Sequence, residues 1–183
     1  MKNRKLHRCN IWKALCVAIW MALIIMFVSN VCKLRNVCAA GQEKGYIYIE
    51  QTEDANVIRY TEEIGAEYGI CPELLQAIVF YESSNNPNAR NGKCVGYMQI
   101  SEKWHGDRMD RLGVKSLTDG YGNILVGADY LAELAGKYED IPLALMKYNG
   151  DADAEQLYAA GEMSDYAKKI LDLSTELERL HGK

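Results

Sequence analysis

The chain has 183 residues, of which 49% are hydrophobic and 25% charged, a composition typical of one globular domain with a core of its own. Residues 1–40 hold seven Lys and Arg and no Asp or Glu, whereas residues 41–183 hold 14 basic and 25 acidic residues. Nucleic-acid binding depends on neutralising phosphates, so this acidic excess argues against nucleic acid as a partner.

Residues 1–40 have the pattern of a targeting segment. Basic residues between positions 2 and 13 precede an uncharged run from Ala14 to Cys32, and Ala39 and Ala40 supply the small residues of a cleavage site. As a helix the run would span about 28 Å, close to the roughly 30 Å hydrocarbon core of a bilayer. We therefore expect either a cleaved signal peptide or a membrane anchor, with a buried soluble helix as a third interpretation. Both main interpretations predict export, to the cell wall or to the outer face of the cytoplasmic membrane.

The rest of the chain is divided into a polar linker over residues 41–55 and one helical domain over residues 56–183. A 3–4 spacing of apolar residues predicts a first helix from Val57 that ends at Gly69. Pro72 suits the first turn of a second helix, which reaches Glu82 and is apolar on most sides, so we expect it to be central and buried.

A loop rich in Asn, Pro and Gly follows over residues 83–92, and the apolar segment 95–100 is short but compatible with a strand. Further helices are predicted over 102–112, 120–138, 141–148, 154–159 and from 164 toward the C-terminus. Asp119 is the expected cap of the helix over 120–138. The fold class is therefore mainly α, a compact helical domain with little or no sheet.

The exported domain keeps two of the six cysteines, Cys71 and Cys94. In an oxidising compartment they favour one disulfide, which would tie the start of the helix that ends at Glu82 to the segment 95–100. Two separate buried thiols are the alternative. No metal site is expected, because structural zinc normally takes four ligands and, with the cysteines paired, only His105 and His181 remain in the domain. Gly-rich phosphate loops are missing too, and no cofactor is expected.

Glu82 is the residue best placed for chemistry. It follows an apolar run at the end of a helix expected to be buried, and burial disfavours an ionised carboxyl. The negative end of the helix dipole acts in the same direction. Both effects raise the pKa, as a general acid that works near neutral pH requires. Taken alone, the pattern also fits a glutamate that points into solvent.

Several motifs around Glu82 favour the catalytic role over a side chain that points into solvent. Glu82-Ser83 is followed by NPNA at residues 86–89, GYMQI at 96–100 and ALMKYNG at 144–150. With these motifs, in this order, the chain resembles the transglycosylase SLT domain, the catalytic module of lytic transglycosylases, which shares its fold with goose-type lysozyme. The similarity extends over about residues 57–172 and implies a lysozyme-like helical domain.

The resemblance implies a role for each matching residue. Glu82 falls on the family's catalytic acid/base, and Tyr148 on a tyrosine whose hydroxyl points toward that carboxyl. Met98 and Gln99 fall on a groove strand that contacts the sugar next to the cleaved bond. The positions implied to bind substrate are Ser83, Met98, Gln99, Tyr148 and Asn149. Glu82, Gln99 and Tyr148 are therefore expected to converge on one open cleft lined by amide and aromatic groups.

The implied substrate is the glycan strand of peptidoglycan. Most glycoside hydrolases pair two carboxylates, but Asp119 is expected to cap a helix, and Asp107 and Asp110 to lie on a solvated helical face. A lone Glu82 fits the family reaction, in which the 6-hydroxyl of N-acetylmuramic acid attacks its own anomeric carbon and leaves a 1,6-anhydro end. One alternative is a muramidase that uses water on the same bond. Another is a non-catalytic wall-binding subunit of a secretion or conjugation machine.

Overall fold

The computed structural model describes residues 54–183. The predicted signal or anchor over residues 1–40 and nearly all of the linker over 41–55 lie outside the described residues. The described part forms seven helices and one two-stranded hairpin, so the predicted mainly helical fold is confirmed there. None of the helices in this part of the chain is long and apolar enough to cross a membrane.

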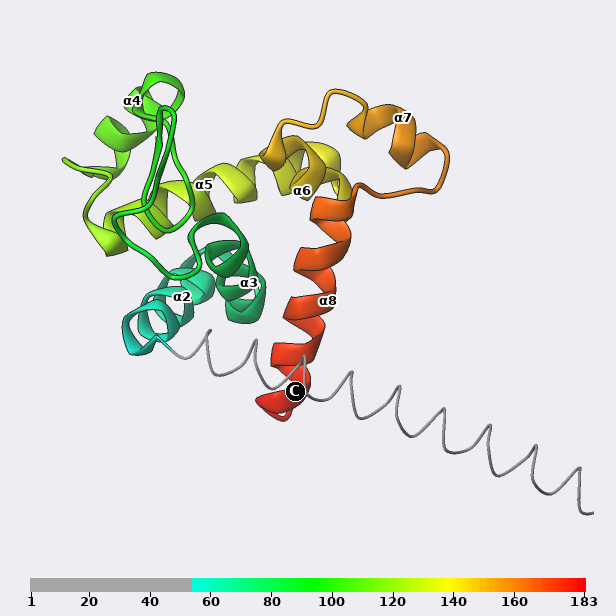
Figure 1. Ribbon diagram of the computed structural model, residues 1–183, viewed down its shortest axis with the longest axis horizontal. Coiled ribbons are helices and arrows are strands. Elements are labelled where there is room, and N and C mark those ends of the chain that lie inside the picture. Colours follow the sequence, from blue (N-terminus) through cyan, green and yellow to red (C-terminus); the bar gives the residue numbers. More distant parts are fainter. Residues whose placement is uncertain (1–53) are drawn as a thin grey trace, which may run out of the picture. The chain divides into compact units, whose positions relative to one another are not determined.

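The elements follow the order expected from the sequence (Figure 1). They are α2 (Ala55–Tyr68), α3 (Pro72–Ser83), β1 (Arg90–Asn91), β2 (Cys94–Val95), α4 (Glu102–Leu112), α5 (Gly120–Tyr138), α6 (Ile141–Asn149), α7 (Ala154–Ala159) and α8 (Asp165–Leu180).

The helix ends are set by local chemistry that could be predicted. Gly69 ends α2 in the left-handed conformation, with φ 66°, and Pro72 opens α3, both as expected. The Asp119 side chain caps α5 by accepting a hydrogen bond from the Gly122 amide at 2.9 Å. The role of Asp119 as a helix cap is therefore confirmed.

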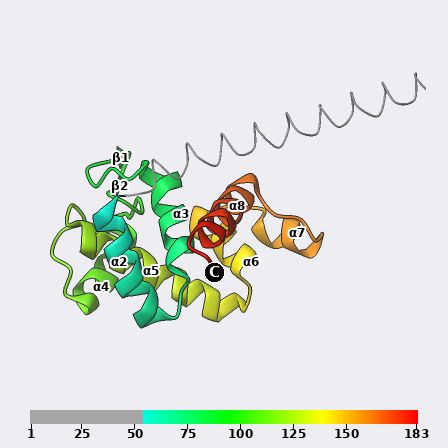
Figure 2. The ribbon, with the colours of Figure 1, turned by 90° about the horizontal axis from the view of Figure 1, so that it is seen from below.

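Helix α3 is the centre of the domain. Its residues from Glu73 to Phe80 are all buried, and Leu75, Ile78 and Val79 are completely inaccessible to solvent. It packs against α2 on one side and α8 on the other, and Figure 2 shows it between these two helices. A helix that is apolar all round needs such neighbours, and its burial fixes the position of Glu82 in its last turn.

The segment 95–100, whose sequence is compatible with a strand, is not a continuous strand in the structure. Only Cys94 and Val95 are extended, paired with Arg90 and Asn91, and residues 96–99 form a tight turn. Val95 and Ile100 close this turn by exchanging backbone hydrogen bonds of 2.9 and 3.0 Å. The turn reverses the chain because Gly96 has φ 81° and Gln99 has φ 48°, values that a strand does not allow.

Candidate active site

Glu82 lies in the last turn of α3, and its carboxylate is held by a residue from the far end of the chain. Tyr166, in the first turn of α8, donates a hydrogen bond from its hydroxyl to Glu82 Oε1 at 2.6 Å. Because α3 packs against α8, the two side chains meet although 84 positions separate them. This contact fixes one carboxylate oxygen and leaves Oε2 as the oxygen available for a reaction.

The environment of Glu82 changes its acidity in the direction expected from the sequence. Burial raises the pKa of the carboxyl, and the hydrogen bond from Tyr166 opposes this effect without cancelling it. Tyr166 itself is strongly disfavoured as a phenolate, because burial and then the charge of Glu82 raise its pKa. Tyr166 is therefore a permanent hydrogen-bond donor at working pH, and Glu82 is the group that titrates.

Tyr148, whose hydroxyl was expected to point toward Glu82, forms its hydrogen bond with another group. The Tyr148 hydroxyl donates to the backbone carbonyl of Met98 at 2.9 Å, whereas Tyr166 donates to Glu82. Tyr148 still lies near the carboxyl, because burial and then the charge of Glu82 raise the pKa of its hydroxyl. Tyr148 thus anchors the turn over residues 96–99 beside Glu82. The sequence did not reveal that a second tyrosine, Tyr166, would donate the hydrogen bond to the Glu82 carboxylate.

The turn over residues 96–99 is held on its other side by Asn123 of α5. The Asn123 side chain accepts from the Met98 amide at 2.8 Å and donates to the carbonyls of Val95 at 2.8 Å and Leu117 at 2.9 Å. It is fully buried, so these bonds satisfy an amide that would otherwise be costly in the core. The sequence analysis did not single out Asn123. Its place on the apolar face of α5 was a signal, because a buried side-chain amide needs hydrogen-bond partners.

Met98 and Gln99 occupy different environments, although both were expected to contact the sugar. The Met98 side chain is completely buried and lies against Gly127 of α5, where an added Cβ would come within 2.5 Å of its sulfur. The Met98 side chain thus belongs to the core, where its thioether fills the space beside Gly127, and the expected contact of this residue with the sugar stays a prediction that only its backbone could fulfil. Gln99 is partly exposed, and its amide nitrogen donates to the carbonyl of Gly96 at 2.9 Å.

Ser83 and Asn149, the other residues implied to bind substrate, have local partners. The Ser83 hydroxyl donates to the carbonyl of Val79 at 2.9 Å. Asn149 is exposed at the end of α6, and its amide donates to Asp151 Oδ1 at 2.6 Å. The second oxygen of Asp151 is buried without a hydrogen-bond partner among the described residues, and its charge is one of the smaller effects that raise the pKa of Tyr166. Asp151 is thus a second acidic group near Tyr166 that sequence reasoning did not single out.

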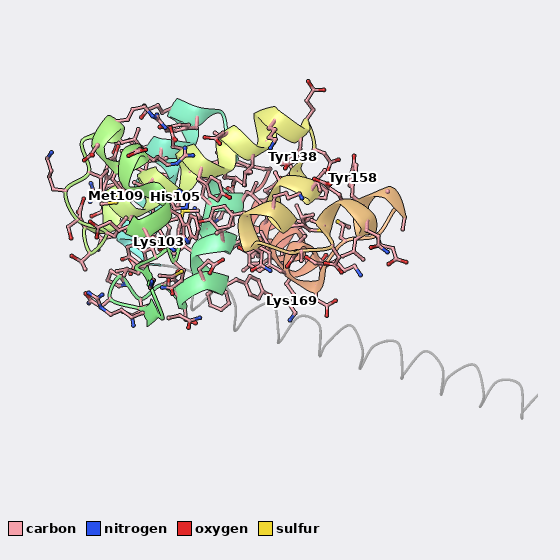
Figure 3. All side chains as sticks on the ribbon, turned by 90° about the horizontal axis from the view of Figure 1, so that it is seen from above. Lys103, His105, Met109, Tyr138, Tyr158 and Lys169 are labelled. Carbon is pink, nitrogen blue, oxygen red and sulfur yellow. The ribbon has the colours of Figure 1, made fainter. Side chains whose placement is uncertain are left out.

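An aromatic row extends from Tyr148 to α4. The ring centroids of Tyr148 and Tyr130 are 5.4 Å apart, and those of Tyr130 and His105 are 4.6 Å apart. His105 interrupts the helical backbone of α4, with φ −124° and ψ 15°, and Figure 3 shows it on that helix. Burial lowers the pKa of His105, and the charge of Arg108 adds to this. The row connects the Glu82 neighbourhood to α4 through rings that pack against one another.

The cysteines predicted to form a disulfide are two free thiols in the structure. Cys71 lies at the start of α3 and donates from its sulfur to Glu73 Oε2 at 2.9 Å. Cys94 lies in β2, which follows α3 and the loop after it. The structure thus departs from the predicted bond.

The other carboxylates considered as catalytic partners either cap a helix or lie on an exposed helix face. Asp119 caps α5, and Asp107 and Asp110 are exposed on α4. The pKa of Glu82 is raised by burial, and the hydrogen bond from Tyr166 opposes this effect. In the part of the chain that the structure describes, Glu82 is therefore the carboxyl that combines burial, a raised pKa and a fixed orientation.

Comparison with known proteins agrees with this geometry. The family model described as the transglycosylase SLT domain matches residues 59–169, which include Glu82, the turn over residues 96–99, Tyr148 and Tyr166. A protein of Enterobacteria phage PRD1 named "Transglycosylase" is 33% identical over 121 residues, 64% of this chain and 43% of that protein.

A second group of relatives is bacterial. The "Endo-type membrane-bound lytic murein transglycosylase A" of Salmonella paratyphi B is 36% identical over 95 residues, 48% of this chain and 45% of that protein. The protein of the same name from Salmonella enteritidis has the same identity and coverage. The chain thus spans less than half the length of these relatives.

Proposed function

Because this chain belongs to the transglycosylase SLT-domain family, we propose that it is a peptidoglycan lytic transglycosylase. The bond cleaved is the β-1,4 bond between N-acetylmuramic acid and N-acetylglucosamine, and Glu82 is the single acid/base. The observation that carries the proposal is the half-buried Glu82 carboxyl with its raised pKa and its 2.6 Å hydrogen bond from Tyr166.

The proposed reaction needs two proton transfers at one oxygen. Protonated Glu82 donates from Oε2 to the glycosidic oxygen, and the bond from that oxygen to the anomeric carbon of muramic acid breaks. The same oxygen, now part of a carboxylate, takes the proton of the 6-hydroxyl as that hydroxyl attacks the anomeric carbon. The product is a 1,6-anhydro end, the carboxyl is protonated again, and no water is consumed. An intramolecular nucleophile has a high effective concentration, so no second carboxylate is needed to activate it.

Tyr166 supports both halves of this cycle. Its hydrogen bond to Oε1 stabilises the carboxylate formed in the first step and limits how far burial raises the pKa. It also keeps the carboxyl plane in one orientation, so that Oε2 can serve the leaving oxygen and then the 6-hydroxyl. We propose that Gln99, Tyr148, Asn149 and Ser83 line the glycan site around it, with Met98 acting through its backbone.

The main alternative is a muramidase-type hydrolase, and one observation favours it. Asp151 has a buried carboxylate oxygen without a hydrogen-bond partner among the described residues, and its charge acts on Tyr166. If Asp151 activated a water molecule, the products would carry hydrated reducing ends. Against this, the other oxygen of Asp151 is bound by the Asn149 amide at 2.6 Å.

Digestion of purified peptidoglycan, followed by mass spectrometry of the released fragments, tests the proposal. A transglycosylase leaves anhydromuramic ends, whereas a hydrolase leaves reducing ends that are heavier by one water. Absence of any released fragment would favour the non-catalytic alternative, a wall-binding subunit of a secretion or conjugation complex. The proposed substrate implies that the domain works outside the cytoplasmic membrane, which agrees with the targeting pattern expected for residues 1–40.

A further inference from the structure

A hollow lies apart from Glu82. Its volume is about 420 Å³, and its walls come from the β1–β2 hairpin, the start of α4 and the loop before α5. Neither Glu82 nor Tyr148 lines it. Its charged lining residues are Arg90, Lys93, Lys103, Lys115 and one acid, Glu102. Four of the 14 basic residues of an otherwise acidic domain are therefore gathered at one place.

These cations are not neutralised by the protein. No described residue forms a salt bridge with Arg90, Lys93 or Lys115, and all three are exposed. The Lys103 ammonium lies 4.4 Å from the ring centroid of Trp104. Like charges held close together repel each other, and an anion between them removes that cost. The charge pattern of the hollow thus fits a negatively charged ligand.

Uncharged groups of the hollow indicate an anion as well. Ser101, which precedes α4, is one of the residues that line the hollow and is only 7% exposed. Its hydroxyl is buried and has no hydrogen-bond partner among the described residues. The Ser101 hydroxyl does not cap α4. The amides of Glu102 and Lys103 in the first turn have no acceptor within the helix, and the Ser101 side chain does not supply one. A buried hydroxyl without a partner is costly unless a ligand satisfies it, and helix N-termini favour anions.

We propose that this hollow, the Ser101 pocket, binds a carboxylate of the peptide attached to the glycan strand. This inference rests on the proposed function, because it takes the occupant from the same substrate. Ser101 is two residues beyond Gln99, which places the pocket within about 7 Å of chain from the turn beside Glu82. The exposed Trp104 ring, 74% accessible, adds apolar surface beside Lys103 that an organic ligand covers and that inorganic phosphate leaves bare.

Binding tests the pocket independently of catalysis. Calorimetry on the full-length protein would compare a wall peptide with free carboxylates and the same peptide amidated at each carboxylate. The double variant Lys93→Gln/Lys115→Gln is expected to bind the free peptide about tenfold or more weakly, the effect of losing a charge-assisted hydrogen bond. The matched control, Lys168→Gln/Lys169→Gln, removes two exposed lysines of α8 outside the pocket (Lys169 is labelled in Figure 3) and is expected to bind normally.

Ser101→Ala distinguishes specific binding in the pocket from non-specific electrostatic attraction, because it changes no charge. It is expected to weaken binding of the free peptide severalfold and to leave the amidated peptide unaffected. Equal weakening by both lysine pairs, or equal affinity for free and amidated peptide, would overturn the proposal. Tighter binding of a phosphate-bearing wall polymer or of inorganic phosphate than of the peptide would also overturn it.

Kinetics then connect the pocket to the wall. On glycan strands that carry peptides, Lys93→Gln/Lys115→Gln is expected to raise KM about tenfold with kcat unchanged; on strands stripped of peptides, it is expected to match the unmodified protein. Equal KM changes on both substrates would contradict the pocket's role. If neither substrate is cleaved by the unmodified protein while the peptide still binds at the pocket, the proposed function fails and the pocket stands.

Discussion

Tyr166 holds Glu82 by a 2.6 Å hydrogen bond across the packed faces of α3 and α8. The tyrosine is on the buried side of α8, in line with Ile170 and Leu173, which belong to the core. The geometry of the acid/base therefore depends on how the last helix of the chain packs. This dependence connects the stability of the helix pair to the proposed chemistry.

Replacing Glu82 by Gln should abolish wall cleavage while the fold remains. Gln keeps the shape and can still accept the Tyr166 hydrogen bond, but it cannot donate and recover a proton. Loss of a general acid lowers rates by roughly 10²–10⁴-fold. Fragment release from peptidoglycan measures the activity, and circular dichroism with thermal unfolding verifies the fold. Near-normal activity in a folded variant would remove Glu82 from the mechanism.

Tyr166→Phe should move the pH profile of cleavage. The Tyr166 hydrogen bond lowers the pKa of Glu82, so its loss raises that pKa. The proposed acid is active when protonated, and the alkaline limb of the profile should therefore move to higher pH. Tyr148→Phe is the matched control, because it removes a hydroxyl bound to Met98 and should lower activity without moving that limb. A Tyr166→Phe profile that matches the original would show that the hydrogen bond does not tune Glu82.

Local chemistry explains how much of the structure could be predicted. The spacing of apolar residues identified α3 as buried, and Gly69, Pro72 and Asp119 marked helix ends correctly, because these signals act within a few residues. The raised pKa of Glu82 followed from the burial of its helix. The Tyr166 contact, the burial of Met98 against Gly127 and the separation of Cys71 from Cys94 depend on how distant helices pack, which no local pattern contains.

Asn123→Ala should loosen the turn beside Glu82. The Asn123 side chain makes three hydrogen bonds to backbone groups of the turn and of Leu117. Leaving such buried groups without partners costs about 2–4 kcal/mol of unfolding free energy in total. Urea unfolding measures the loss, and Asn56→Ala, an exposed position at the start of α2, is the control expected to change little. Wall cleavage should fall in Asn123→Ala even at temperatures where the domain stays folded.

The contacts of the C-terminal residues with Glu73 should make the free energy of unfolding depend on pH in the acid range. This buried carboxylate is bound by Cys71 Sγ at 2.9 Å, His181 Nδ1 at 2.7 Å and Lys183 Nζ at 2.7 Å. Burial raises its pKa, but the bonds from Cys71, Lys183 and His181 outweigh burial and lower the pKa from 4.5 to about 2.

Because the folded pKa is depressed, the stabilisation by Glu73 is complete above about pH 4.5 and is lost as pH falls toward about 2. Urea unfolding at neutral pH and near pH 3 should show this loss in the original chain. In Glu73→Gln the loss should be smaller, because the titrating group is gone. Removal of residues 181–183 should lower stability at neutral pH, since it leaves a buried carboxylate without two of its three partners. Identical pH dependence in the original chain and in Glu73→Gln would show that other groups govern the acid response.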